Sequence, residues 1–125
     1  MGENGEMRSY LLVAVGGAVG ASVRWGVGES ISRTPGVFPY ATLLVNIAGC
    51  ALIGLAARTL IRGSDRWMIA VTGLLGGLTT YSTFATETRE LLDTGHPGQA
   101  LLYVATSIVA GLAATELARG DWRRP

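Results

Sequence analysis

The 125-residue sequence contains no lysine and has few charges of either sign. Its ten basic residues are all arginines, and they nearly balance nine carboxylates to give a formal net charge of +1. Charged residues make up 15% of the chain, whereas soluble domains average about 25%. Because there is no basic field, nucleic acid is not an expected partner. The shortage of charge indicates a chain that exposes little surface to water.

Cysteine and histidine are also scarce, with one residue of each. Cys50 cannot form an intrachain disulfide, and we interpret it as a small packing residue. His96 has no second metal-ligating residue near it in sequence, so it does not indicate a metal site. No serine has a histidine or lysine within helical reach to activate it. We therefore expect that the chain is not an enzyme.

Charge is missing altogether from four long stretches, at residues 9–23, 34–57, 67–86 and 94–115. A helix that crosses the hydrocarbon layer needs about 20 mostly apolar residues. Three stretches reach this length unaided, and the first reaches it by including Arg24, which must then snorkel or face a polar interior. None has the regularly charged face of a soluble helix. We predict a single-domain, all-α membrane protein with four transmembrane helices.

Turn and capping residues place the ends of these helices. Pro35 lies in the turn after the first helix, and Pro39 suits the first turn of the second. Ser64 can cap the third helix, and Gly95 and Pro97 lie in the last loop. Within a domain that spans residues 1–125, we expect helices at about residues 9–30, 40–60, 65–90 and 97–119, followed by a loose tail at 120–125.

The third helix contains a sequence that does not favour a continuous helix. Gly76 and Gly77 each weaken helical structure by about 1 kcal/mol relative to alanine, and threonines and serine follow at bilayer depth. Unwound backbone in a membrane must be covered by protein or water, and carbonyls freed there commonly coordinate an ion. We predict a break near residues 76–80. The alternative is that these glycines only allow close helix packing, as the small-xxx-small spacings of Gly16 with Gly20 and of Gly73 with Gly77 also suggest.

Polar residues of the second and fourth helices recur at a spacing of four, which places each pair on one helix face. The pairs are Thr42 with Asn46, and Tyr103 with Ser107. Asn46 could equally form a hydrogen bond between helices, and Tyr81 and Phe84, which share a face, could simply pack. The four uncharged stretches hold no Asp, Glu, Lys or His, so a proton-coupled pump would lack its usual carboxylate. Passive permeation along uncharged donors and aromatic rings remains.

Three blocks of the sequence resemble the signature segments of the Fluc, or CrcB, family of fluoride channels. They read GGAVGASVRW, ATLLVNIAGCALIG and GLLGGLTTYSTFATE. The resemblance, which extends from about Leu11 to Gly120, implies an antiparallel, dual-topology dimer in the cell inner membrane that exports fluoride and relieves fluoride toxicity. It also implies a sodium ion, the lipid bilayer and a second subunit as partners. Arginines are unevenly distributed between the two sides of the expected helices, which favours one orientation in the membrane, so the second subunit is either an identical chain or an oppositely oriented paralogue.

The same resemblance assigns residues to the ion path. The residues implied to line it are Arg24, Thr42, Asn46, Tyr81, Ser82, Thr83, Phe84, Tyr103 and Ser107. Gly76 and Thr79 would give backbone carbonyls to a structural sodium ion at the dimer centre. Tyr81 stands where the family pattern TTFSTF has phenylalanine. Aromatic ring edges carry positive potential and can replace water around an anion without a fixed charge, and Arg24 would concentrate anions at the pore mouth.

Two other functions are compatible with four helices in a chain of this length. A small multidrug exporter would need a carboxylate within the first helix, and residues 9–28 contain none. A structural subunit of a membrane complex would not require Asn46, the paired glycines and the threonine run together.

Overall fold

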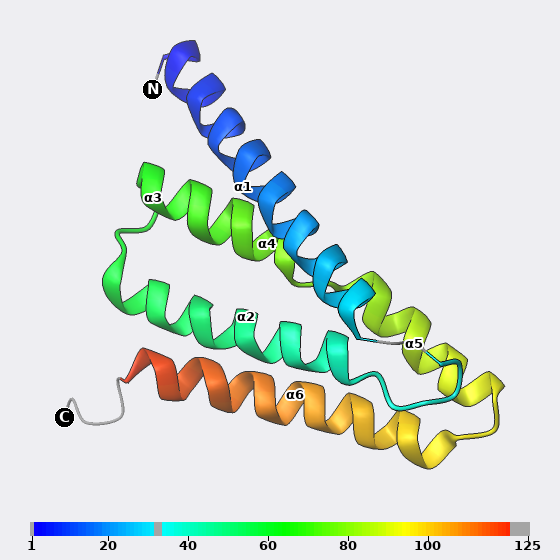
Figure 1. The fold of residues 1–125 in the computed structure, drawn as a ribbon. Coiled ribbons are helices and arrows are strands. Elements are labelled where there is room, and N and C mark those ends of the chain that lie inside the picture. Colours follow the sequence, from blue (N-terminus) through cyan, green and yellow to red (C-terminus); the bar gives the residue numbers. More distant parts are fainter. Residues whose placement is uncertain (1, 32–33, 121–125) are drawn as a thin grey trace.

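The computed structural model describes residues 2–31 and 34–120 (Figure 1). Over these ranges every element of regular secondary structure is a helix, and four helical passages are long and apolar enough to cross a membrane. The elements are α1 (Glu3–Ser30), α2 (Tyr40–Thr59), α3 (Asp65–Trp67), the π-helix η1 (Met68–Leu75), α4 (Gly76–Leu78), α5 (Tyr81–Asp93) and α6 (Pro97–Arg119). The predicted all-α membrane architecture is confirmed, with α3 to α5 forming the third passage.

The ends of the helices follow local chemistry. α1 begins at Glu3, before the expected start at residue 9, and carries Glu3 and Glu6 in its first turn, where carboxylates favour the positive end of the helix dipole. Ser64 caps α3, because its Oγ accepts a hydrogen bond from the Trp67 N–H at 3.2 Å. α6 ends before Gly120, whose φ of 71° suits glycine. The rest of the expected tail, residues 121–125, lies outside the described residues.

The helices form two closely packed pairs. α2 lies beside α6, and α1 crosses the stretch from α3 to α4 (Figure 1). The start of α1 and the end of α6 lie on the side where α2 turns into α3, and the connection between α5 and α6 lies at the opposite end. An even number of passages therefore returns the chain to the side from which it starts.

Glycines allow α1 to touch η1 and α4 backbone to backbone. A Cβ at Gly16 would collide with the Ile69 carbonyl oxygen, and one at Gly20 would collide with the Leu74 carbonyl oxygen. From the other side, a Cβ at Gly73 would lie 3.0 Å from the Cα of Gly16, and one at Gly77 would collide with the Gly17 carbonyl oxygen. The close helix contact expected from small-residue spacing is confirmed. We call the contact made by Gly16, Gly20, Gly73 and Gly77 the glycine seam.

The third passage breaks at Thr79 and Thr80, which both have extended backbone. Their φ and ψ angles are −80° and 152° for Thr79, and −144° and 127° for Thr80. The predicted break is confirmed, but Gly76 and Gly77 themselves remain helical in α4. Their small size serves the contact with α1, while the threonines supply the unwound backbone.

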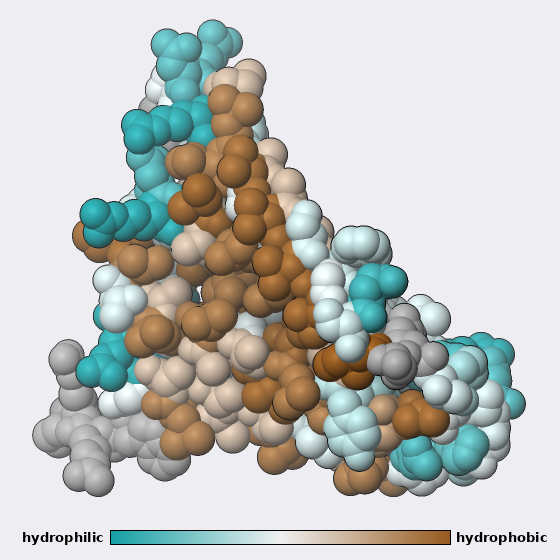
Figure 2. Space-filling model, in the orientation of Figure 1, coloured by the Kyte–Doolittle hydropathy of each residue, from teal (hydrophilic) through white to brown (hydrophobic). Residues whose placement is uncertain are grey.

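The buried core is small and lies between α2, α5 and α6. Leu43, Leu91, Ala100 and Tyr103 form it, and Phe38, Ile47 and Phe84 pack against it. Most other large apolar side chains are exposed, including Leu101 and Val109 on α6. Figure 2 shows an apolar band over the middle of the molecule, with hydrophilic residues towards its ends. Such a surface suits contact with lipid or with another apolar protein surface.

Candidate functional site

Asn46 on α2 holds the break in the third passage with two hydrogen bonds to one residue. Its Nδ2 donates to the Thr80 carbonyl oxygen at 3.1 Å, and its Oδ1 accepts from the Thr80 N–H at 3.0 Å. A side-chain amide thereby satisfies both backbone groups of a residue that has left the helix, which is necessary where water is scarce. In this structure Asn46 joins α2 to the break by hydrogen bonds.

Hydroxyl groups gather where α5 begins. The Oγ1 of Thr80 accepts a hydrogen bond from the Thr83 N–H at 3.1 Å and lies 3.1 Å from the Oγ1 of Thr83. The Ser82 Oγ lies 3.3 Å from the same Thr80 oxygen. Because a helix N-terminus has a positive dipole end, this cluster surrounds a position that favours an anion.

Thr79 packs directly against α2. A Cβ at Gly49 would collide with the Cγ2 of Thr79, so only glycine leaves room for this side chain. The Oγ1 of Thr79 donates to the Leu75 carbonyl oxygen at 2.9 Å. Among the described residues, the carbonyl oxygens of Gly76 and Thr79 accept no hydrogen bond from loops, caps or side chains. These two oxygens fit the ligand type that a sodium ion requires.

Arg24 reaches from α1 to the end of α4. Its Nε donates to the Gly77 carbonyl oxygen at 3.1 Å in a partly buried contact. A cation at the C-terminal end of a helix is favourable, because the carbonyls there lack intrahelical partners. Arg24 also lines a cavity of about 160 Å³ together with Thr42, Thr80, Thr83 and further residues of α1, α2 and α5. The guanidinium therefore faces the polar interior that its position in the first passage requires.

Aromatic rings form a row that joins the start of α5 to α6. The ring centroids of Tyr81 and Phe84 are 6.1 Å apart, and those of Phe84 and Tyr103 are 5.1 Å apart. Tyr103 is fully buried, whereas Tyr81 is 81% exposed. Phe38 meets Tyr103 edge to face with centroids 5.6 Å apart. The structure thus brings Phe84 and Tyr103 together inside the protein and places Tyr81 at its surface.

Glu87, which lies one residue beyond the third uncharged stretch, is a site residue that the sequence pattern did not indicate. Its side chain is 4% exposed. Glu87 Oε1 accepts a hydrogen bond from the Thr42 Oγ1 at 2.8 Å, and Oε2 accepts one from the Tyr103 hydroxyl at 2.8 Å. The uncharged stretch 67–86 contains no carboxylate, but the third passage brings one to the polar residues from the next position. Helical spacing contained the signal, because Phe84, Glu87 and Leu91 share one face of α5.

The residues of the two polar pairs expected from spacing, on α2 and on α6, do not share hydrogen-bond partners within each pair. Asn46 binds Thr80, while Thr42 and Tyr103 both bind Glu87. Ser107 lies one turn beyond Tyr103, and its buried Oγ has no hydrogen-bond partner among the described residues. We call the contact formed by Thr42, Asn46, Thr80, Glu87 and Tyr103 the polar seam. It joins α2, the start of α5 and α6.

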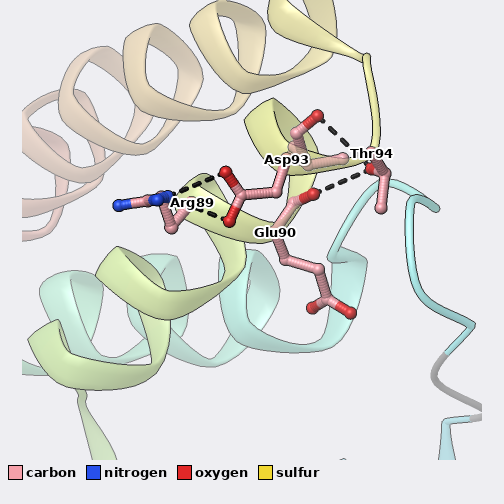
Figure 3. A network of polar contacts seen from close by, with 5 residues as sticks. Arg89, Glu90, Asp93 and Thr94 are labelled. Atoms are coloured by element: carbon pink, nitrogen blue, oxygen red, sulfur yellow. Dashed lines mark hydrogen bonds and ion pairs between the residues drawn. The ribbon is translucent and has the colours of Figure 1, made fainter.

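The C-terminal end of α5 carries a separate, exposed set of contacts. The Nε of Arg89 lies 2.9 Å from both carboxylate oxygens of Asp93 (Figure 3). The Thr94 hydroxyl donates to the Glu90 carbonyl oxygen at 2.8 Å and closes the last turn. These local pairs stabilise the end of the helix and take no part in the polar seam.

Comparison with known proteins gives consistent matches over most of the chain. Residues 11–119 match the family described as CrcB-like protein, Camphor Resistance (CrcB). A fluoride-specific ion channel FluC from Bordetella petrii is 46% identical over 113 residues, which cover 87% of each chain. One from Thermus thermophilus is 45% identical over 111 residues, covering 85% of this chain and 88% of the relative. One from Paracoccus denitrificans is 46% identical over 109 residues, covering 85% and 87%.

Proposed function

This chain belongs to the CrcB family, and we propose that it forms a passive, fluoride-selective ion channel that exports fluoride from the cytoplasm. The observation that carries the proposal is the polar seam, in which hydroxyl and amide donors meet a buried carboxylate beside a broken membrane helix, with the Phe84 ring next to Tyr103. A channel of this kind catalyses no covalent reaction. The multidrug-exporter and structural-subunit alternatives are not favoured, because the relatives are fluoride-specific ion channels.

The proposed path uses groups that can replace water around a small anion. Ser82 and Thr83 offer hydroxyls at the start of α5, and Phe84 offers a ring edge beside Tyr103. Ser107 supports a continuation along α6, since its buried hydroxyl has no partner among the described residues. Arg24 supplies positive charge at the cavity. Because the donors are uncharged, fluoride is bound weakly enough to leave, and the membrane potential drives it outward.

We also propose a structural sodium ion held by the carbonyl oxygens of Gly76 and Thr79 at the dimer centre. These oxygens lie at the break and accept no hydrogen bond from described loops, caps or side chains. An unsatisfied carbonyl costs several kcal/mol in a dry membrane. Two copies related by a two-fold axis would present such carbonyls to one cation.

An antiparallel, dual-topology dimer in the cell inner membrane completes the proposal. Leu11, Val15, Val19 and Val23 form an exposed apolar stripe along α1, which leaves room for a second subunit or lipid. Among the described residues, the side where α1 begins and α6 ends holds five arginines, and the other side holds two: Arg8, Arg58, Arg62, Arg66 and Arg119 against Arg24 and Arg89. This bias favours cytoplasmic termini. An antiparallel homodimer needs the same chain inserted in both orientations, which such a bias disfavours. An oppositely oriented paralogue is therefore the alternative partner to an identical chain.

Labelling of single cysteines at each terminus, in a Cys50→Ser background, distinguishes the two partners. Equal labelling from both sides of the membrane supports the homodimer, because the same chain then inserts both ways. Labelling from the cytoplasmic side alone supports the paralogue.

The function itself is tested with purified protein in liposomes. We expect efflux of fluoride without efflux of chloride or of a cationic dye. Transport of the dye would support an exporter instead. Absence of any transport from well-folded protein would support the structural subunit.

A further inference from the structure

The turn between α2 and α3 carries an excess of positive charge. Arg58 lies in the last turn of α2, Arg62 lies in the connection, and Arg66 lies in α3. The one carboxylate of this segment, Asp65, pairs with Arg8 of α1. The three arginines are exposed, and none forms an ion pair with a described carboxylate. We call Arg58, Arg62 and Arg66 the arginine cluster.

The opposite end of the molecule has no such set within the described residues. Arg24 is partly buried and donates to a backbone carbonyl of α4. Arg89 is paired with Asp93. Of the two ends of the described chain, one alone therefore offers exposed guanidinium groups without a carboxylate partner.

The surroundings of the arginine cluster place it at the surface of the membrane. The turn joins two passages that are long and apolar enough to span, so it lies where lipid headgroups begin (Figure 1). Ile61, which directly precedes Arg62, is 80% exposed. The guanidinium carbon of Arg62 lies 5.6 Å from the centroid of the Trp67 ring, and tryptophan is typical of the membrane interface.

The cluster offers the donors that a phosphate group requires. A guanidinium carries five N–H donors in a planar fork that matches phosphate oxygens. Arg62 is restricted by its stacking on Trp67. Arg58 lies at the end of α6, because a Cβ at Gly120 would be 3.3 Å from its Nη1. Two of the three guanidinium groups are thus positioned before a ligand binds, which lowers the entropy lost on binding.

We propose that the arginine cluster binds the phosphate of an anionic phospholipid, whose acyl chains pack against Ile61 and Trp67. A free phosphate ion would meet the same donors but would leave the apolar side chain of Ile61 in water. A zwitterionic lipid would bring no net negative charge to the cluster. The proposed antiparallel dimer would place one such site in each leaflet. The inference rests on the membrane-spanning fold and not on the ion that the chain carries.

Quenching of tryptophan fluorescence by brominated lipids tests the site. Of the three tryptophans, one variant keeps Trp67 alone and a second keeps Trp25 alone, with phenylalanine at the other positions. Each is placed in vesicles of brominated phosphatidylglycerol with plain phosphatidylcholine, and in the reverse mixture. Around Trp67, phosphatidylglycerol should be preferred by about tenfold. Trp25 is the matched control, since it is 70% exposed at the opposite end, and should show no preference.

Neutralising the cluster gives the second arm of the test. In the variant that keeps Trp67, the combined substitutions Arg58→Gln, Arg62→Gln and Arg66→Gln should abolish the preference. Arg89→Gln in the same background should retain it, because Arg89 lies at the other end. If the triple variant does not assemble, Arg66→Gln alone should lower the preference by about threefold.

The outcomes separate the lipid site from its alternatives. Equal quenching by the two lipids around Trp67 overturns the inference, and so does a preference that survives the arginine substitutions. Inorganic phosphate, compared with chloride at equal ionic strength, should leave the preference unchanged. Its loss in phosphate alone would assign the cluster to the free ion and overturn the lipid site. Fluoride efflux from the same vesicles tests the proposed function separately.

Discussion

The two halves of the third passage are held to the rest of the molecule by different chemistry. Before the break, η1 and α4 contact α1 through the glycine seam, where backbone meets backbone. After the break, α5 contacts α2 and α6 through the polar seam, where side chains exchange hydrogen bonds. Close packing has no alternative arrangement of similar energy, whereas hydroxyls and carboxylates can change partners. The first half therefore anchors the helix, and the second half can respond to an ion.

Gly20→Ala should have the largest effect, because it inserts a Cβ between two rigid backbones. The new atom would lie 2.8 Å from the Leu78 backbone nitrogen and collide with the Leu74 carbonyl oxygen. We expect a loss of stability of about 3 kcal/mol, measured by thermal unfolding in detergent. Gly26→Ala is the matched control on the same helix, since nothing lies within 4 Å of its added Cβ. Equal stability of the two variants would contradict the glycine seam.

Asn46→Asp should have the next largest effect, because it damages the polar seam at the break. Aspartate can accept from the Thr80 N–H but cannot donate to the Thr80 carbonyl oxygen, and its charge repels anions. We expect fluoride efflux to fall by about 100-fold, equivalent to about 2.7 kcal/mol. Thr86→Ala, which removes an exposed hydroxyl bonded only to the Ser82 carbonyl among the described contacts, should leave efflux near wild type. Normal efflux through Asn46→Asp would place the path elsewhere.

Replacement of sodium by a large organic cation should have a moderate effect on both stability and fluoride efflux, because the proposed ion lies where the two halves of the third passage meet. The proposed ion binds the carbonyls of Gly76 and Thr79, which lie on either side of the point where α4 ends. Because a ligand that binds the folded state stabilises it by mass action, the melting temperature and fluoride efflux should both drop, and both should recover when sodium returns. Indifference of both measurements to sodium would argue against the ion.

Tyr81→Phe should have the smallest effect. Tyr81 is 81% exposed, and its ring, 6.1 Å from that of Phe84, is retained by phenylalanine. We expect fluoride efflux within about twofold of wild type, a difference of about 0.4 kcal/mol. A loss as large as that of Asn46→Asp would give the Tyr81 hydroxyl a role in the path that its exposure does not suggest.

The fold could be predicted because its causes are local. Uncharged stretches of spanning length indicate membrane helices, and paired glycines before a threonine run indicate a weak helix. The break lies within the predicted range 76–80, but the choice of Thr79 and Thr80 over the glycines could not be predicted, because Asn46 on another helix stabilises the unwound Thr80. Glu87 was missed for a similar reason. Its partners Thr42 and Tyr103 are distant in sequence. In addition, a glutamate that directly follows an uncharged stretch is expected to lie at the polar end of a membrane helix.

Fluoride efflux through Phe84→Ile, compared with Phe38→Ile, tests most directly whether the ion passes along α5 beside the polar seam. These are the two phenylalanines of the chain, and both contact Tyr103, but only Phe84 lies on α5 in the proposed path. Isoleucine keeps the apolar bulk and removes the ring edge. The account predicts that Phe84→Ile lowers efflux by about 100-fold, or about 2.7 kcal/mol, in a protein that still assembles, while Phe38→Ile stays near wild type. Wild-type efflux through assembled Phe84→Ile would contradict it.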